Sequence, residues 1–278
     1  MGLSFGVPEF SRTLAGSERP VTFANDDEQL VGVLHLPEAM ANVDCPAVVI
    51  LHGFGGHKAG QMFVKLARRL ANIGVVAFRI DCRGSGDSAG EFADTTTSRQ
   101  LSDTLLALEL LAALDGVDAG RLGGVGLSMG GSVMSTVAGC HDRLRSLVLW
   151  SAASSDPTDI VDRYLSEYAG RPNAPEPYIA WGGVVLNEAF FTDIQAWQGR
   201  HIETMLRYGG PVLILHGEAD EMVSVEHAHR FAHHYRTRSG SPRTEFETIP
   251  GADHVFNAVA WETRVLDRSV AFLEETLR

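Results

Sequence analysis

The chain has 278 residues, of which 45% are hydrophobic and 21% are charged, a composition typical of folded globular proteins and not of disordered ones. Its 35 aspartates and glutamates outnumber its 23 lysines and arginines, and the formal net charge of −12 argues against nucleic acid as a partner. No stretch approaches the roughly 18 consecutive apolar residues that a membrane span requires.

Short β-branched runs alternate with helical patterns along the chain. Apolar residues at 21–23 and 30–36 predict a leading hairpin with its turn at 25–27. Buried strands are then expected at 47–51, 75–80, 122–127, 144–150 and 212–215. Apolar residues recur at helical spacing between them, as in 62–73 and 101–112. This alternation predicts an α/β fold, a mostly parallel twisted sheet with helices on both faces, which binds ligands at the carboxyl ends of its strands.

Residues 154–210 interrupt the alternation. This segment holds four prolines, four of the five tyrosines and two of the four tryptophans, and it is too long for a plain crossover. We therefore expect a partly helical cap, inserted into a single domain that spans residues 1–278. Many of its aromatic side chains should form the cap's own core. Tyr178, Trp181 and Phe190 are predicted to line a substrate pocket, together with Val223 beyond the cap.

The motif Gly126-Leu-Ser-Met-Gly130 follows an expected strand and precedes a helix of small residues. Small residues on both sides of a serine allow a tight, strained turn that presents its hydroxyl above the sheet. A bare G-x-S-x-G motif is common by chance, but this strand, turn and helix context is the one that a nucleophile requires. Ser128 is therefore the predicted nucleophile.

A serine hydroxyl needs a base to take its proton and an acid to orient that base. Asp220 lies in the loop after the strand at 212–215, and His254 lies in the loop after the next strand. The chain order serine, aspartate, histidine is that of hydrolase folds built on this kind of sheet. Glu218 and Asp156 are rival acids, whereas Asp253, adjacent to the histidine, is expected to point away from it.

Acyl transfer also needs hydrogen-bond donors for the developing oxyanion. The amide of Met129 has this position at a helix N-terminus. The second donor is expected to be the amide of Phe54, in the glycine-rich segment 52–56. His52 should brace this loop and take no part in the chemistry. The proposed chemistry needs neither a metal nor an organic cofactor.

Two other patterns have simpler interpretations. His229 and His233 have the i, i+4 spacing of metal ligands, but without H-E-x-x-H or a third ligand they are expected to lie on a solvated helix face. The glycine-rich segment 81–86 lacks the spacing and the lysine of a phosphate loop. It predicts a tight turn in which Arg83 pairs with a carboxylate.

The three cysteines, at 45, 82 and 140, form no C-x-x-C pair, so neither a disulfide framework nor a zinc site is expected. The first six residues lack the basic and apolar segments of a secretory signal, and we expect a cytoplasmic protein. Only two of the basic residues are lysines, which suggests a bacterial source. The oligomeric state stays open, a homodimer included.

Taken together, these motifs resemble the α/β-hydrolase superfamily, and most of all its feruloyl and cinnamoyl esterase group. The segments that carry the resemblance are 52–58, 81–90, 126–131, 216–220 and 251–254, and it extends over about residues 20–276. The resemblance implies an α/β-hydrolase fold, a triad of Ser128, Asp220 and His254, and an oxyanion hole at Phe54 and Met129. It also implies a cap that bears the acyl or aromatic pocket.

The leading hypothesis is a serine esterase that cleaves a small-molecule carboxylic ester of a small or aromatic acyl group through an acyl-enzyme. The same triad would serve a thioesterase or acyltransferase, although coenzyme A favours a basic rim and this chain is acidic. A peptidase is disfavoured, because 278 residues leave no room for the gating domain that such relatives usually carry. A ligand receptor or scaffold with a vestigial triad is the alternative outside enzymes.

Overall fold

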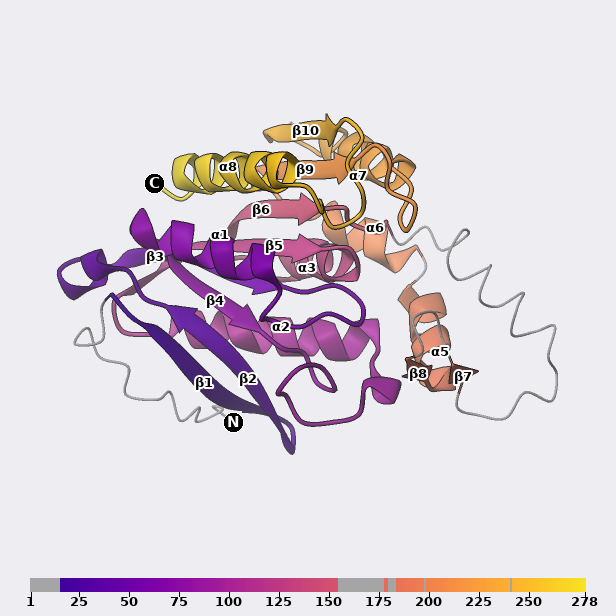
Figure 1. Ribbon diagram of the computed structural model, residues 1–278, viewed down its shortest axis with the longest axis horizontal. Helices are drawn as coiled ribbons and strands as arrows, with labels where there is room; N and C mark the ends of the chain where they lie inside the picture. The colour runs from indigo at the N-terminus through magenta and orange to yellow at the C-terminus, as the bar shows by residue number, and fades with distance from the viewer. Residues whose placement is uncertain (1–15, 155–177, 180–183, 198, 241) are drawn as a thin grey trace.

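A computed structural model of the chain describes residues 16–154, 178–179, 184–197, 199–240 and 242–278 (Figure 1). At its centre lies an eight-stranded sheet in the order β1-β2-β4-β3-β5-β6-β9-β10. The strands are β1 (Glu18–Asn25), β2 (Glu28–His35), β3 (Cys45–Leu51), β4 (Val76–Ile80), β5 (Val117–Leu127), β6 (Leu144–Trp150), β9 (Val212–Gly217) and β10 (Thr244–Ile249). Pairing is antiparallel in the leading hairpin and between β2 and β4, and parallel elsewhere. The predicted sheet is confirmed.

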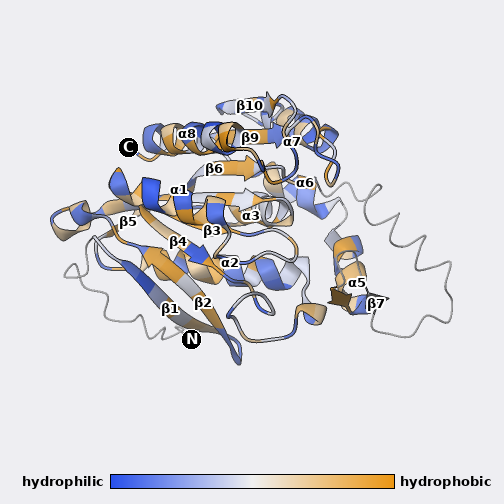
Figure 2. Cartoon of the chain, viewed as in Figure 1, coloured by the Kyte–Doolittle hydropathy of each residue, from blue (hydrophilic) through white to orange (hydrophobic). Residues whose placement is uncertain are grey.

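Helices cover both faces of the sheet, as predicted. The helices α1 (Gln61–Asn72) and α8 (Val259–Thr276) pack on one face. The other face is covered by α2 (Thr97–Ala112), α3 (Met129–Cys140) and α7 (Glu226–Arg236). Figure 2 shows hydrophobic residues concentrated in the central strands, whereas the edge strand β1 is mainly hydrophilic. None of the helices in the described ranges combines the length and apolarity needed to cross a bilayer.

One strand is longer than its apolar run predicts. The run indicates a strand from residue 122, but β5 begins at Val117, which pairs with Cys45 on β3 before the register shifts. Residues 118–121 are Asp-Ala-Gly-Arg, so no apolar pattern marks this first part. Backbone pairing at the amino edge of the sheet extends the strand where side-chain burial does not.

The described residues between β6 and β9 contain two short strands and two helices, of which the second packs against α3. They include the antiparallel pair β7 (Tyr178–Ile179) and β8 (Val185–Leu186), then α5 (Glu188–Trp197) and α6 (Arg200–Met205). Figure 1 shows α5 and the β7–β8 pair beyond the carboxyl ends of the strands. Ser98 on α2 anchors α5, since its Oγ contacts Asp193 and accepts a 2.8 Å hydrogen bond from Trp197 Nε1.

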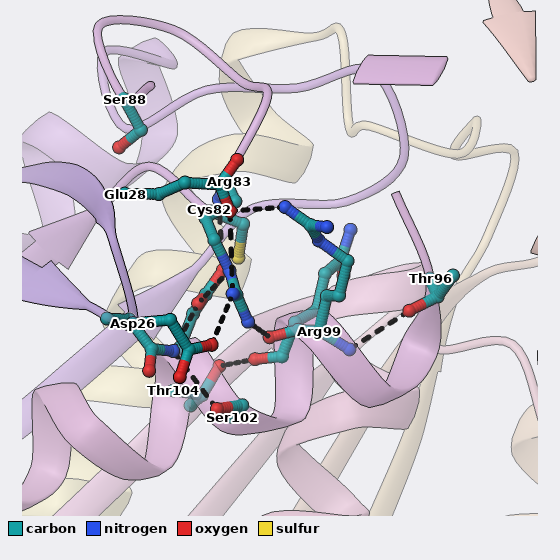
Figure 3. Close-up of polar contacts among 12 residues, drawn as sticks. Asp26, Glu28, Cys82, Arg83, Ser88, Thr96, Arg99, Ser102 and Thr104 are labelled. Atoms are coloured by element: carbon teal, nitrogen blue, oxygen red, sulfur yellow. Dashed lines mark hydrogen bonds and ion pairs between the residues drawn. The ribbon is translucent and has the colours of Figure 1, made fainter. Parts of the chain in front are cut away.

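A buried arginine fastens the leading hairpin to α2 and to the loop after β4. The Nε atom of Arg83 lies 2.8 Å from Oδ1 of Asp103, and the Arg83 amide donates to Oδ2 of the same carboxylate. Its guanidinium also reaches Asp26 in the hairpin turn (3.1 Å) and the carbonyl of Arg99, as Figure 3 shows. The expected pairing of Arg83 with a carboxylate is confirmed.

Asp103→Ala should therefore destabilise the protein by about 3 kcal/mol, because it leaves a buried guanidinium without its closest anion. Asp118→Ala is the matched control, since Asp118 and Arg121 form a half-exposed surface pair worth less than about 1 kcal/mol. Urea unfolding at neutral pH measures both. Equal losses in the two variants would show that the Arg83 network does not hold these elements together.

Candidate active site

Ser128 occupies a strained turn between β5 and α3. Its backbone has φ 56° and ψ −123°, a conformation that residues other than glycine rarely adopt and that costs about 1–3 kcal/mol. The turn is held on both sides. The Ser128 amide donates a 2.8 Å hydrogen bond to the carbonyl of Trp150 on β6, and the Ser128 carbonyl accepts from the amide of Gly131 at 2.9 Å. This is the predicted strand-to-helix elbow.

The glycines around the serine allow three backbone segments to touch. A Cβ atom at Gly126 would lie 2.3 Å from the carbonyl oxygen of Gly130, and one at Gly130 would lie 2.2 Å from that of His52. A Cβ at Gly53 would be 3.0 Å from Cβ of Ser128. No side chain fits at these contacts. The loop after β3 therefore packs directly against the serine.

Asp220 and His254 are in contact at the same edge of the sheet. His254 Nδ1 lies 2.7 Å from Oδ2 of Asp220, and both side chains are buried. The other carboxylate oxygen, Oδ1, accepts from the amides of Met222 (2.9 Å) and Val223 (2.8 Å). Because a carboxylate can only accept at His254 Nδ1, this nitrogen carries the proton and Nε2 is left as the acceptor.

Among the described residues, the carboxylates of Glu218 and Asp253 bind groups other than His254. Oε1 of Glu218 accepts a 2.7 Å hydrogen bond from Thr248, and the Asp253 carboxylate accepts from the amide and side chain of Asn257. Asp253 thus turns away, as expected, and caps the start of the following turn. Asp156 lies outside the described residues.

Polar contacts from four residues keep Asp220 ionised. Burial would raise its pKa, but donors from His216, His254 and the Val223 amide outweigh that effect and hold the pKa well below its usual range. His216 Nε2 lies 3.1 Å from the same Oδ2 that contacts His254. The sequence contained this histidine in the 216–220 motif, but nothing in the spacing assigned it a function.

The contact between Ser128 and His254 differs from that between Asp220 and His254. Among the described residues, Ser128 Oγ forms no hydrogen bond with His254. Catalytic hydrogen bonds are often long in free enzymes and shorten when substrate binds. The two side chains nevertheless belong to the same sheet edge, because Trp150 links the end of β5 to β6 and pairs in turn with Leu215 of β9.

Two backbone amides are free beside Ser128. Neither the Phe54 amide nor the Met129 amide donates a hydrogen bond to any other part of the described chain. His52 braces the Phe54 loop: its Nδ1 donates to the carbonyl of Gly53 (2.8 Å), and its Nε2 accepts from the amide of Cys82 (3.1 Å). Unpaired amides of this kind can bind an anionic oxygen.

An apolar cluster of mainly aromatic side chains includes Phe54 and packs against Met129. The ring of Phe54 is 5.7 Å from that of Phe190 on α5 and 5.1 Å from that of Phe92. Phe190 also meets Phe191 edge to face, and Met129 packs against the same group. The α5 layer thus reaches the sheet edge through apolar contacts next to Ser128.

Two other predicted pocket residues, Val223 and Tyr178, lie in the described part of the chain. Val223 is buried beside the acid, since its amide contacts Asp220 and its carbonyl contacts His216. Tyr178 pairs in β7 with Leu186, which belongs to the aromatic cluster. Trp181 lies outside the described residues. Within the described ranges, no three His, Cys, Asp or Glu side chains are grouped so that they could hold a metal ion.

The sheet, the elbow and the comparisons with known proteins define the chain as a serine hydrolase of the α/β-hydrolase superfamily. It belongs to the prolyl oligopeptidase family, whose model matches residues 61–278. Est1E from Butyrivibrio proteoclasticus, solved with ferulic acid bound, is 26% identical, and the match covers 92% of this chain and 99% of that one with a TM-score of 0.75.

Two more distant structures share the fold. A putative hydrolase from Agrobacterium vitis S4 is 22% identical over 92% of this chain and 98% of its own, with a TM-score of 0.74. Mouse alpha/beta hydrolase domain-containing protein 10 is 19% identical over 92% of this chain and 99% of its own, with a TM-score of 0.72.

The depressed pKa of Asp220 predicts a pH-dependent contribution to stability. The contribution is complete above the ordinary aspartate pKa of about 4 and is lost as the pH falls through that value toward the folded-state pKa. Asp220→Asn should therefore lower the free energy of unfolding by about 1–3 kcal/mol at neutral pH, and the difference from wild type should shrink below about pH 4.

Denaturant unfolding of both proteins between about pH 7 and pH 3 measures this difference. Asp253→Asn is the control, because the Asp253 carboxylate is hydrogen-bonded to the neighbouring Asn257 and not, within the described ranges, to His254. A difference for Asp220→Asn that stays constant or grows toward acid pH would contradict the assignment of these hydrogen bonds to an ionised carboxylate.

Proposed function

We propose that the protein is a serine carboxylic-ester hydrolase that works through a covalent acyl-enzyme. The single observation that supports this most is the 2.7 Å contact of His254 Nδ1 with the buried Asp220 carboxylate, at the sheet edge that bears the strained Ser128. In this proposal Ser128 is the nucleophile, His254 the base and Asp220 the acid that orients it.

Each step follows from these roles. Ser128 Oγ attacks the ester carbonyl carbon while His254 Nε2 takes the hydroxyl proton. The tetrahedral oxyanion binds the free amides of Phe54 and Met129. As it collapses, the bond to the alcohol oxygen breaks, and His254 delivers its proton to that oxygen. Water then attacks the acyl-enzyme, gives a proton to His254, and the acid leaves as Ser128 regains its hydrogen.

The aromatic cluster supports an apolar acyl group. Phe54, Phe190 and Met129 lie beside the nucleophile, and such a wall favours a flat or aliphatic chain over a charged one. Est1E was solved with ferulic acid, an aromatic acid. We extend this to the present chain as an aromatic or short apolar acyl specificity, with residues 154–210 acting as the cap that selects the substrate.

A peptidase is the second candidate, because the family match supports it. Serine peptidases use the same acyl-enzyme chemistry with an amine as the leaving group. Parallel assays of p-nitrophenyl esters, an acyl-coenzyme A and proline-containing peptide anilides separate the esterase, thioesterase and peptidase functions. Thermal stabilisation by an ester without product release would indicate a receptor instead.

The Ser128→Ala variant should lose turnover of p-nitrophenyl acetate by more than about 10³-fold and should no longer be labelled by a fluorophosphonate probe. Ser132→Ala is the matched control, since Ser132 lies one turn further along α3 and bonds to the carbonyl of Ala153. It should keep both properties. Labelling that survives in Ser128→Ala and disappears in Ser132→Ala would reassign the nucleophile.

The Phe190→Ala variant tests the acyl wall. It should lower kcat/KM for methyl ferulate by about tenfold or more, with a smaller effect on p-nitrophenyl acetate, because acetate is too short to contact the ring. The ratio of the two rates in one protein preparation corrects for any loss of folded enzyme. An unchanged ratio would place the acyl group elsewhere.

A further inference from the structure

His216 is a fully buried histidine whose ring contacts the acid of the proposed site. It is the penultimate residue of β9, a strand buried along its whole length. Its Nε2 atom lies 2.8 Å from the carbonyl oxygen of Val223 and 3.1 Å from Oδ2 of Asp220. One ring atom therefore binds both the carboxylate and the backbone of the loop that carries it.

The hydrogen-bond partners determine which nitrogen carries the proton. Both groups at Nε2 are acceptors, so Nε2 must be the donor. The other nitrogen, Nδ1, is buried and has no hydrogen-bond partner among the described residues. His216 thus donates through Nε2.

The Asp220 carboxylate is saturated by this arrangement. Oδ1 accepts from the amides of Met222 and Val223, while Oδ2 accepts from His254 and lies 3.1 Å from His216 Nε2. These four polar contacts restrain the orientation of the carboxylate. Because Oδ2 interacts with two imidazoles, its electrostatic interaction with His254 is weaker than it would be with His254 alone.

We propose that His216 is a positioning residue: by donating Nε2–H to Asp220 Oδ2 it fixes the carboxylate and limits the charge that acts on His254. The effect of His216 on catalysis rests on the proposed esterase function. His216 touches neither the substrate nor the nucleophile in this proposal, and it acts through Asp220 alone.

The ionisable groups on the surrounding elements are engaged elsewhere. On the β10 side, Glu218 is bonded to Thr248, the register partner of His216. Asp253 in the loop after β10 is bonded to Asn257. On α7, His227 Nδ1 accepts from the amide of Ser154. Among the described residues, the ionisable group that contacts the His216 ring is therefore Asp220.

The test compares two replacements at this position. His216→Phe keeps a ring of similar size but removes the donor, whereas His216→Gln keeps an N–H near Nε2. Without the donor, Oδ2 acts more strongly on His254 and stabilises its protonated form. The acid limb of kcat/KM for p-nitrophenyl acetate should then move to higher pH by about half a unit, and kcat should fall by about tenfold with little change in KM.

Rescue by His216→Gln should restore the pH profile and most of kcat. His141→Phe is the control for loss of a buried histidine, because His141 binds Glu109 at the opposite edge of the sheet; it should lower the melting temperature without moving the acid limb. If His216→Phe loses activity with an unmoved or lowered acid limb, His216 is only a packing residue and the proposal is wrong.

Imidazole ¹⁵N NMR of the wild-type protein measures which ring nitrogen of His216 carries the proton, and it needs neither substrate nor variant. The expected spectrum has a protonated, exchange-protected Nε2 and an unprotonated Nδ1 at His216 near neutral pH. A proton on Nδ1 would overturn the proposal even if the variants do not fold. Absence of ester turnover in the wild type would instead contradict the proposed function, while the NMR result would still test the Nε2-protonated form of His216 that the proposal requires.

Discussion

The backbone of Ser128 is the constraint on which the arrangement of the site depends. A positive φ at a residue with a side chain is unfavourable, and here it persists because β5, α3 and the loop after β3 meet at glycines 126, 130 and 53. Next to the serine, the Phe54 and Met129 amides donate no hydrogen bond to any described residue. The strained turn thus presents the Ser128 hydroxyl and the Met129 amide, and the neighbouring loop presents the Phe54 amide.

The position of Asp220 depends on a different constraint: a buried carboxylate needs hydrogen-bond donors. Removing a carboxylate from water is costly unless hydrogen bonds replace its hydration. Around Asp220 the replacements come from the turn that contains it, from His254 and from the strand that precedes it. These hydrogen bonds restrain the loop that connects β9 to α7. A restrained acid is what a proposed base at His254 requires.

Local patterns in the sequence were sufficient for the sheet, the elbow and the contact between Asp220 and His254, because each depends on a short apolar run or on glycine spacing. Other features depend on tertiary contacts that leave no local pattern. The first part of β5 is polar, and only pairing of Val117 with Cys45 makes it a strand. His216 has the apolar context of a core residue, and its contact with Asp220 arises from the fold of the following loop. Phe54 was expected as a source of an amide, while its ring also joins Phe190 and Phe92.

The most direct test of the account is to trap the covalent intermediate. Rapid acid quenching of the wild-type enzyme during its reaction with an activated aromatic ester, followed by digestion and mass spectrometry, would reveal where the acyl group is attached. The account predicts a mass increase equal to that acyl group on the peptide that contains Ser128. Turnover with an acyl group on another residue, or with no protein-bound acyl group at any time, would contradict it.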